Sequence, residues 1–326
     1  MKCIITGGAG FIGSNLAEKL VKLGHNVIVI DNLSTGRLKN LEKIKNKIKF
    51  VTHDISQDSK KFRRHFNKVD WVFHLAGLAD IVPSIKDPSK YFKANVEGTL
   101  NVINASKEKN IKKLVYAASA SCYGLPNSFP TNEKSQIDTR YPYALTKYLG
   151  EKLVLDWSRI YKANNLSLRF FNVYGPKSRT SGAYGAVFGV FLAQKLSNKP
   201  LTVVGNGKQT RDFIHVYDLV SGLIKAAQRG KPGDVYNIGA GKEVSVNYIA
   251  KLIGGKKVFI PKRPGEPDRS LACIKKIKKK LNWKPKVSIE KGVKELLSNK
   301  NHWLDAPVWT PKKIKYATKE WFKYLK

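Results

Sequence analysis

The stretch Thr6-Gly7-Gly8-Ala9-Gly10-Phe11-Ile12-Gly13 decides the fold class, because it joins a short apolar run to a helical pattern. The preceding Lys2–Thr6 is rich in β-branched residues, as is typical of a buried strand. In such a connection Gly7 permits a sharp turn, and Gly10 lets the backbone approach a pyrophosphate. Gly13 lets the helix lie close to the strand, and the helix amino end favours negative charge. The stretch therefore predicts a strand, a phosphate-binding turn and a helix.

The second predicted strand ends at Asp31, 24 positions after Gly7. A carboxylate there can accept hydrogen bonds from the adenosine ribose hydroxyls and would repel a 2′-phosphate, so NAD is favoured over NADP. Asp54 follows the third strand and is a candidate contact for the adenine amine. A solvated loop carboxylate is the alternative interpretation of Asp54.

Strand and helix patterns alternate through the first half of the chain, which predicts a doubly wound α/β fold with a parallel sheet covered on both faces. A helix is expected from Pro88 towards Lys107. We assign residues 1–172 to a dinucleotide-binding domain, to which residues 212–240 are expected to return. The predicted strands are Lys2–Thr6, Val27–Asp31, Lys49–Thr52, Val69–Leu75, Lys113–Ala118 and Ser167–Phe170.

The second half is interrupted by glycine and proline turns and predicts a smaller, mixed α/β C-terminal lobe. We assign residues 173–326 mainly to this substrate lobe, with helices near Ala186–Leu196, Tyr217–Ala227 and Val246–Ile253. It should stand over the carboxyl ends of the strands, where open α/β sheets bind ligands. The tail beyond Ser298 carries three tryptophans, which predict that it packs against another part of the molecule.

The charge balance is unusual: 60 Lys and Arg residues against 24 Asp and Glu residues give a formal net charge of +36. Much of it is lysine in solvent-facing runs such as 275–280, and no nucleic-acid-binding motif accompanies it. We therefore favour a solvated surface over a nucleic-acid footprint. No stretch is long enough to insert into a membrane, and the opening leaves no room for a signal peptide, so a cytoplasmic protein is expected. Cys3, Cys122 and Cys273 lack metal-ligand spacing, which predicts reduced thiols and no metal site.

Tyr143 and Lys147 lie one helical turn apart on the same face. Lys147 and a positive nicotinamide ring would both lower the pKa of the phenol, which could then take a proton from a substrate hydroxyl. Ser119 follows the strand Lys113–Ala118 and could hold the same oxygen. A half-buried tyrosine beside a solvated lysine is the alternative, since this spacing is common in helices.

The chain resembles the extended short-chain dehydrogenase/reductase family, in its NAD-dependent sugar-nucleotide epimerase/dehydratase branch, and there the UDP-glucose 4-epimerase group. The resemblance covers roughly residues 1–297. It is carried by TGGAGFIG, Asp31, HLAG (74–77), Asn95, SASCYG (119–124), YALTK (143–147), RFFNVYGP (169–176), GNGKQTRDFIHVYDL (205–219), YNIGAG (236–241) and RPGEPDR (263–269).

The resemblance implies a role for each matched position. Lys147 would hold the nicotinamide ribose, while Tyr143 and Ser119 would serve a sugar hydroxyl. The residues expected to bind NAD are Gly7, Gly10, Phe11, Ile12, Gly13, Asp31, Asn32, Asp54, Ile55, Leu75, Ala76, Asn95 and Lys147. The residues expected to bind a UDP-sugar are Ser121, Asn172, Arg211, Arg263, Glu266 and Ser270. A homodimer is usual in this family.

The residues after Ser119 discriminate between reactions of the branch. Its dehydratases place Asp-Glu there and its decarboxylases commonly place a Glu two residues on, whereas this chain has Ala120, Ser121 and Cys122. The resemblance therefore implies C4 epimerisation of a UDP-hexose or UDP-N-acetylhexosamine, through a transient 4-keto sugar to which the hydride returns. Ser270, where a bulky tyrosine would exclude an N-acetyl group, leaves room for one, although it is equally compatible with a loop serine.

Three alternatives stay open. A UDP-glucuronate 4-epimerase would present a carboxylate suited to Lys177 or Arg179. Another dehydratase or reductase of the branch would need an acid and a base placed elsewhere. An NAD-binding or RNA-associated protein without catalytic activity would have no use for Ser119, Tyr143 and Lys147 together.

Overall fold

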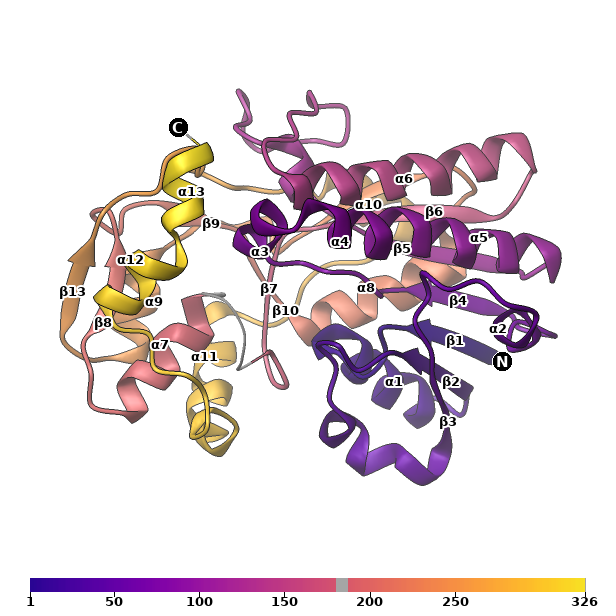
Figure 1. The fold of residues 1–326 in the computed structure, drawn as a ribbon, viewed down its shortest axis with the longest axis horizontal. Helices are drawn as coiled ribbons and strands as arrows, with labels where there is room; N and C mark the ends of the chain where they lie inside the picture. Colours follow the sequence, from indigo (N-terminus) through magenta and orange to yellow (C-terminus); the bar gives the residue numbers. More distant parts are fainter. Residues whose placement is uncertain (180–186, 326) are drawn as a thin grey trace.

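The computed structural model describes residues 1–179 and 187–325, and its centre is a seven-stranded sheet in which all pairings are parallel (Figure 1). The strand order β11-β6-β5-β4-β1-β2-β3 confirms the predicted doubly wound α/β fold. The order reverses around β1, which places a crevice at the strand carboxyl ends. The strands are β1 (Lys2–Thr6), β2 (Asn26–Asp31), β3 (Ile48–Thr52), β4 (Trp71–His74), β5 (Lys113–Ser119), β6 (Asn165–Phe170) and β11 (Val235–Ile238).

The six predicted strands correspond to β1 to β6, with ends that differ by at most two residues. The seventh strand, β11, was not among them. The helix predicted from Pro88 is a succession of α4 (Pro88–Phe92), the π-helical η2 (Lys93–Glu97) and α5 (Gly98–Glu108). The helix predicted from Ala186 begins outside the described residues, and its described part is α7 (Val187–Leu196).

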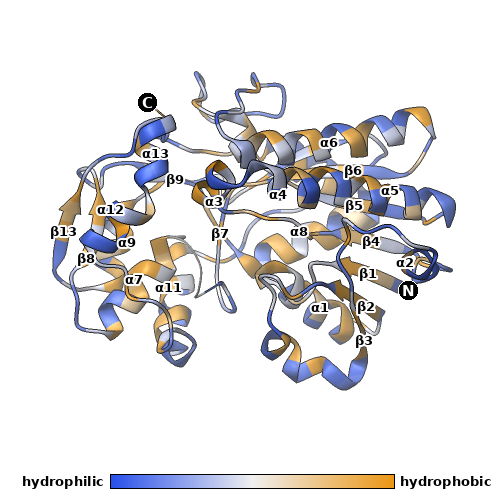
Figure 2. Ribbon diagram, viewed as in Figure 1, coloured by the Kyte–Doolittle hydropathy of each residue, from blue (hydrophilic) through white to orange (hydrophobic). Residues whose placement is uncertain are grey.

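Successive residues of β1 face opposite sides of the sheet, because side chains alternate along a strand. Cys3 and Ile5 join a core cluster with α1 (Phe11–Lys22) and α8 (Val216–Arg229). Ile4 joins a second cluster with α5 and α6 (Pro142–Ile160). Both faces are therefore buried, and Figure 2 shows the strands of this sheet as hydrophobic along much of their length.

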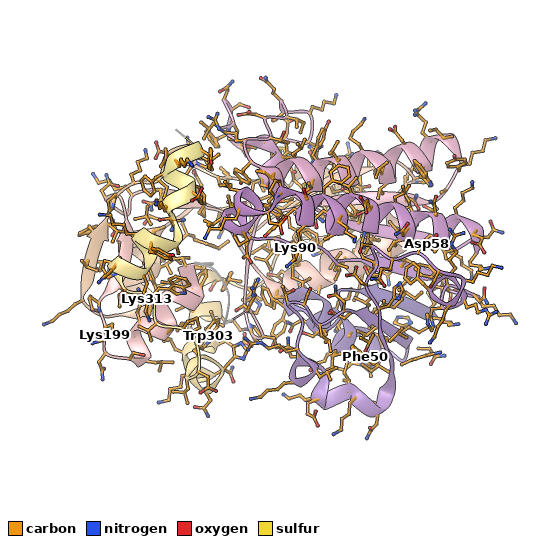
Figure 3. All side chains as sticks on the ribbon, in the orientation of Figure 1. Phe50, Asp58, Lys90, Lys199, Trp303 and Lys313 are labelled. Carbon is orange, nitrogen blue, oxygen red and sulfur yellow. The ribbon has the colours of Figure 1, made fainter. Side chains whose placement is uncertain are left out.

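A smaller set of elements, the small lobe, has a core of its own that includes Phe191, Ile249, Leu296 and Trp303. Trp303 is labelled in Figure 3. Its sheets are two-stranded and mixed: β13 pairs with β8 and β10 with β7 in parallel, while β12 pairs with β9 antiparallel. The elements of this region are β7 (Asn172–Tyr174), α7, β8 (Leu201–Val204), β9 (Thr210–Arg211), β10 (Phe213–His215), β12 (Val244–Ser245), α9 (Val246–Ile253), β13 (Lys257–Ile260) and α11 (Ile289–Ser298).

The chain passes between the large sheet and the small lobe several times. It leaves the sheet after β6, returns with α8 and β11, and leaves again towards α9 and β13. It then returns with α10 (Lys275–Leu281), which contacts β11 and α8, before α11 rejoins the small lobe against α9.

The lysine-rich α10 illustrates where the positive charge lies. It buries Ile277 and Leu281 and exposes Lys275 and Lys278 to solvent. Figure 3 likewise shows Lys199 and Lys313 on the surface of the small lobe. Among the helices of the described ranges, none is long and apolar enough to cross a membrane. Residues 1–179 and 187–325 contain no group of three His, Cys, Asp or Glu side chains placed to bind a metal ion.

Candidate active site

A cavity of about 870 Å³ lies at the carboxyl ends of β1, β2, β4 and β5 and extends to the small lobe. Its lining includes the glycine loop, the junction of β5 with α6, and residues of the 263–270 segment. The sequence therefore brings most of its predicted site residues to one place, as expected at a topological switch point.

The glycine loop is closely packed against backbone, which explains its composition. Gly7 has φ +71°, and a Cβ there would lie 2.7 Å from the backbone of Ala76. A Cβ on Gly13 would lie 2.3 Å from the carbonyl oxygen of Gly7. Gly10 precedes α1 without any side-chain cap, so the amino end of α1 can donate backbone hydrogen bonds to an anion. These features fit the pyrophosphate of a dinucleotide.

Asp31 stands at the end of β2 and lines the cavity. Its carboxylate accepts hydrogen bonds from the backbone of Ala9 at 2.9 Å and Leu33 at 2.8 Å. Burial raises the pKa of Asp31, and the two backbone hydrogen bonds oppose that rise. The carboxylate thus orders the glycine loop and retains lone pairs that could accept from ribose hydroxyls.

Asp54 and Asn32 meet at the far end of the cofactor side. Asn32 Nδ2 donates to Asp54 Oδ2 at 3.1 Å, and the Ser56 hydroxyl donates to Asp54 Oδ1 at 2.8 Å. Burial raises the pKa of Asp54, but these hydrogen bonds outweigh it and leave the pKa below its usual value. The group is therefore an ionised acceptor. The other predicted NAD contacts that line the cavity are Phe11, Ile12, Ile55, Leu75, Ala76 and Lys147.

Asn95 is placed differently from the other predicted NAD contacts. It is fully buried and is not among the cavity-lining residues. Its Oδ1 accepts from Leu78 N at 2.8 Å, while its Nδ2 donates to Leu78 O and to Thr146 Oγ1, each at 3.1 Å. The amide thereby fixes the loop after β4 and joins it to α6.

Ser119, Ser121 and Tyr143 form a hydrogen-bonded corner in the cavity wall. Ser119 ends β5, and its Oγ accepts from Ser121 Oγ at 2.7 Å. Ser119 and Ser121 both lie beside Tyr143, close enough for each hydroxyl to lower the pKa of the phenol. Pro142 begins α6, and the four-residue spacing of Tyr143 and Lys147 places both on the same face of this helix.

Burial dominates the acid–base properties of this corner. It raises the pKa of Tyr143, which the hydrogen bond to Ser119 only partly offsets. Burial lowers the pKa of Lys147 to about 7, against the effect of Glu151. Without the cofactor the net shift of the Tyr143 pKa is upward, and Lys147 is not among its main causes. That Lys147 and a nicotinamide ring together lower this pKa stays a prediction.

Glu151 lies one turn beyond Lys147 on α6, yet its oxygens are occupied by other partners. Arg169 Nη2 pairs with Glu151 Oε1 at 2.6 Å, and Ser167 Oγ donates to Glu151 Oε2 at 2.9 Å. The lysine ammonium instead lies 4.3 Å from the centroid of the Tyr116 ring. The Glu151 carboxylate is thus paired with Arg169. It therefore balances the positive charge of Lys147 only in part.

A second charged cluster lies at the substrate end. Arg211 Nη2 pairs with Glu266 Oε1 at 2.8 Å, and Arg263 Nη1 lies 3.9 Å from Glu266 Oε2. Both guanidinium groups line this end of the cavity, and planar guanidinium groups suit a diphosphate. Asn172 and Ser270 also line the cavity.

Several cavity-lining residues were not predicted as site residues. Tyr141 stacks on Tyr143 with ring centroids 6.3 Å apart, and Trp309 and Trp321 come from the C-terminal tail. Asp80 pairs with Arg179 at 2.6 Å. The tail tryptophans indicated packing, but their partners are too distant in sequence to be identified from it.

The fold and the site define a dinucleotide-dependent enzyme of the Rossmann class with a serine–tyrosine–lysine corner. Residues 3–239 match the NAD dependent epimerase/dehydratase family, and the chain belongs to this family. The recognised resemblance to the extended short-chain dehydrogenase/reductases and the assignment of NAD as cofactor are confirmed, as is the prediction that the chain is an enzyme of the sugar-nucleotide epimerase kind.

Individual relatives include both epimerases and decarboxylases of UDP-sugars. UDP-glucose 4-epimerase of Mycolicibacterium smegmatis is 32% identical over 303 residues, covering 90% of this chain and 96% of the relative. UDP-glucuronic acid decarboxylase 1 of Arabidopsis thaliana is 34% identical over 314 residues, covering 92% and 69%. The crystal structure of UDP-glucose 4-epimerase with UDP-glucose from Thermotoga maritima has a TM-score of 0.88 and 32% identity, covering 94% of this chain and 100% of that one.

Proposed function

We propose that the protein interconverts the C4 epimers of a UDP-hexose or UDP-N-acetylhexosamine. The observation that carries this proposal is the position of Ser119, Tyr143 and Lys147 in the same cavity as the glycine loop and the arginine cluster. The positions after Ser119 carry no carboxylate, so the acid–base pair that elimination would use there is missing. Reversible oxidation at one carbon needs no more than this corner and the cofactor.

In the proposed reaction the phenolate of Tyr143 takes the proton from the sugar O4, and Ser119 holds the same oxygen. Bound NAD would supply the hydride acceptor for C4 and return the hydride. The 4-keto sugar turns about its diphosphate linkage in between, so that the returning hydride meets the other face. Lys147 would hold the nicotinamide ribose, and Tyr143 gives its proton back to O4.

Arg211 and Arg263 would hold the diphosphate, because planar guanidinium groups pair bidentately with phosphate oxygens. The nucleotide is then fixed while the hexose stays free to turn. Ser270, in the same wall, leaves space for an N-acetyl group. Ser270→Tyr should reduce turnover of UDP-N-acetylglucosamine while preserving that of UDP-glucose, measured by product separation; equal turnover of both by the variant would refute this substrate assignment.

The test of the function is Tyr143→Phe, with a panel of UDP-sugars and chromatographic separation of the products. The variant should lose about 1000-fold in kcat, since it lacks the proton-transferring hydroxyl, while its affinity for UDP stays within about twofold. Tyr148, on the same helix, serves as the matched control in Tyr148→Phe. Unaltered turnover in Tyr143→Phe, or a wild-type protein inactive on the whole panel, would overturn the proposal.

A second candidate substrate is a UDP-uronate, favoured by Arg179 in the cavity wall. Lys177, also considered for this role, is paired with Glu18 at 2.6 Å, and Arg179 is paired with Asp80 at 2.6 Å, so a uronate carboxylate would have to exchange with either partner. Arg179→Gln should abolish a preference for UDP-glucuronate and leave UDP-glucose turnover unchanged.

Asp80 lines the same cavity and is the candidate for the displaced acid or base that an elimination would need. Asp80→Asn should therefore stop any release of water from the substrate but spare epimerisation.

We also propose a homodimer formed through α5 and α6, which lie side by side on one face of the sheet (Figure 1). Phe92, Leu145 and Ile160 are exposed along the α4–α5 and α6 helices. Light scattering should give twice the chain mass, and Leu145→Glu should give the monomer. A monomeric wild-type protein would contradict this assignment.

A further inference from the structure

The C-terminal tail joins the two parts of the molecule across the cavity. It comprises η4 (Lys300–Trp303), α12 (Pro311–Ala317) and α13 (Lys319–Tyr324). Trp303 is buried in the small lobe, where η4 contacts α7. At its other end α13 contacts α3 (Ile81–Lys86), which follows the loop after β4 (Figure 1). The tail lies beyond residues 3–239, which match the family.

Two tryptophans and a proline of this tail are part of the cavity wall: Trp309, Trp321 and Pro307. Trp321 is only 5% exposed, and its Nε1 donates to the carbonyl oxygen of Pro264 at 2.7 Å. Its ring therefore has a fixed orientation beside the segment that carries Arg263.

Arg263 lies with its guanidinium carbon 5.4 Å from the centroid of the Trp321 ring, within the range of a cation–π contact. The ring centroid of Tyr141 also lies 6.4 Å from that of Trp321, and Tyr141 stacks on Tyr143. Tyr141 also lies close enough to Ser121 for that side chain to lower the pKa of its phenol. Contacts thus run without a gap from the tail to both the arginine cluster and the catalytic corner.

Gly265 shows how closely the tail is fitted to this segment. It has φ +68°, and a Cβ there would lie 3.4 Å from the carbonyl oxygen of Leu325. The segment that carries Arg263 and Glu266 is therefore packed between the cavity and the tail.

We propose that the tail is an integral part of the substrate site and that Trp321 is a positioning residue for Arg263. The indole face holds the guanidinium plane in the orientation that receives a nucleoside diphosphate. This inference rests on the proposed function only in taking that ligand for the cavity. It adds that affinity for the diphosphate depends on a residue outside the nucleotide-binding half of the chain.

The test measures UDP affinity by calorimetry, without turnover, in Trp321→Leu, Trp321→Phe and Tyr316→Ala. Trp321→Leu keeps much of the volume without an aromatic face and should bind UDP about tenfold more weakly, with unchanged NAD affinity. Trp321→Phe keeps an aromatic face and should recover most of the affinity. Tyr316 is 80% exposed on the same tail, so Tyr316→Ala should equal the wild type.

Equal UDP affinity in Trp321→Leu and the wild type would overturn the inference, and so would equal weakening by leucine and phenylalanine. If the leucine variant does not fold, tryptophan fluorescence of the wild type and of Trp321→Phe is measured with and without UDP. UDP should change the emission of the wild type more than that of the variant, which lacks the indole at the site. Identical changes would also overturn it. A wild-type protein that binds UDP but converts no UDP-sugar would contradict the proposed function and leave the tail's role standing.

Discussion

The cofactor end and the substrate end of the cavity are built from different kinds of group. The phosphate-binding part of the cofactor end consists of backbone: the turn at Gly7, the close contact at Gly13 and the uncapped amino end of α1, all within eight consecutive residues. The substrate end consists of side chains, with Arg211 and Arg263 around Glu266 and an indole from the tail. A backbone site should fail when a side chain intrudes. The ligand affinity of a site built from side chains should change when a charge is removed or when residues that pack against those side chains are replaced.

The largest expected effect is on the backbone side. Gly13→Ala places a methyl group against the Gly7 carbonyl oxygen and the Gly8 Cα, neither of which can move without deforming the loop. We expect about 100-fold weaker NAD binding, measured by calorimetry. Gly24→Ala is the control, because nothing lies within 4 Å of its Cβ although φ is +77°. It should cost about 1 kcal/mol of stability and leave NAD affinity unchanged. Normal NAD binding in Gly13→Ala would contradict the view that the cofactor end depends on close backbone packing and the substrate end on side chains.

The catalytic corner between the two ends is also built from side chains, and it should make stability depend on pH. Lys147 has a pKa lowered to about 7 by burial, whereas the unfolded chain keeps this lysine protonated up to a pKa near 10.5. Because the unfolded state then binds more protons, the free energy of unfolding should rise between pH 7 and 10. Lys147→Met should remove about 2 kcal/mol of that rise, measured by denaturant titration without cofactor. Lys152→Met, on the outer face of α6, is the control. If the free energy of unfolding rose equally with pH in the wild type and in Lys147→Met, the buried Lys147 would not be the source of the rise.

The smallest of the three effects concerns the arginine cluster. Arg211→Gln removes one of the two cations around Glu266 and should weaken UDP binding about 20-fold with unchanged NAD affinity. The exposed Arg159 on α6 provides the control, and Arg159→Gln should match the wild type. An equal loss of UDP and NAD affinity in Arg211→Gln would mean that the two ends are one continuous site.

Much of the cofactor half could be predicted from sequence because its determinants are local. A strand, a glycine turn and a helix follow one another directly, and Tyr143 and Lys147 are one turn apart on one helix. Ser119 could be placed because it ends a strand whose apolar pattern is clear. The strand ends were then uncertain only by a residue or two.

The remaining features depend on contacts between distant segments. β11 is short and pairs with β6 only after α8 has brought the chain back to the sheet, so its residues carry little pattern of their own. Asn95 has no neighbours in sequence that reveal its contacts with Leu78 and Thr146. Trp321 reaches Pro264 and Tyr141 only through the path of the tail. The direction of the Tyr143 pKa shift also depends on burial, which residue spacing does not report.

The repeated passage of the chain between the large sheet and the small lobe has a consequence for ligand length. Several covalent connections share the junction, and the tail adds a further contact at α3. The arginine pair and Tyr143 should thus stay at a constant separation, which sets the length of the linker between nucleoside and hexose that the cavity accepts. A nucleotide sugar with a monophosphate or a triphosphate linker would reach the arginines with its hexose short of Tyr143 or beyond it.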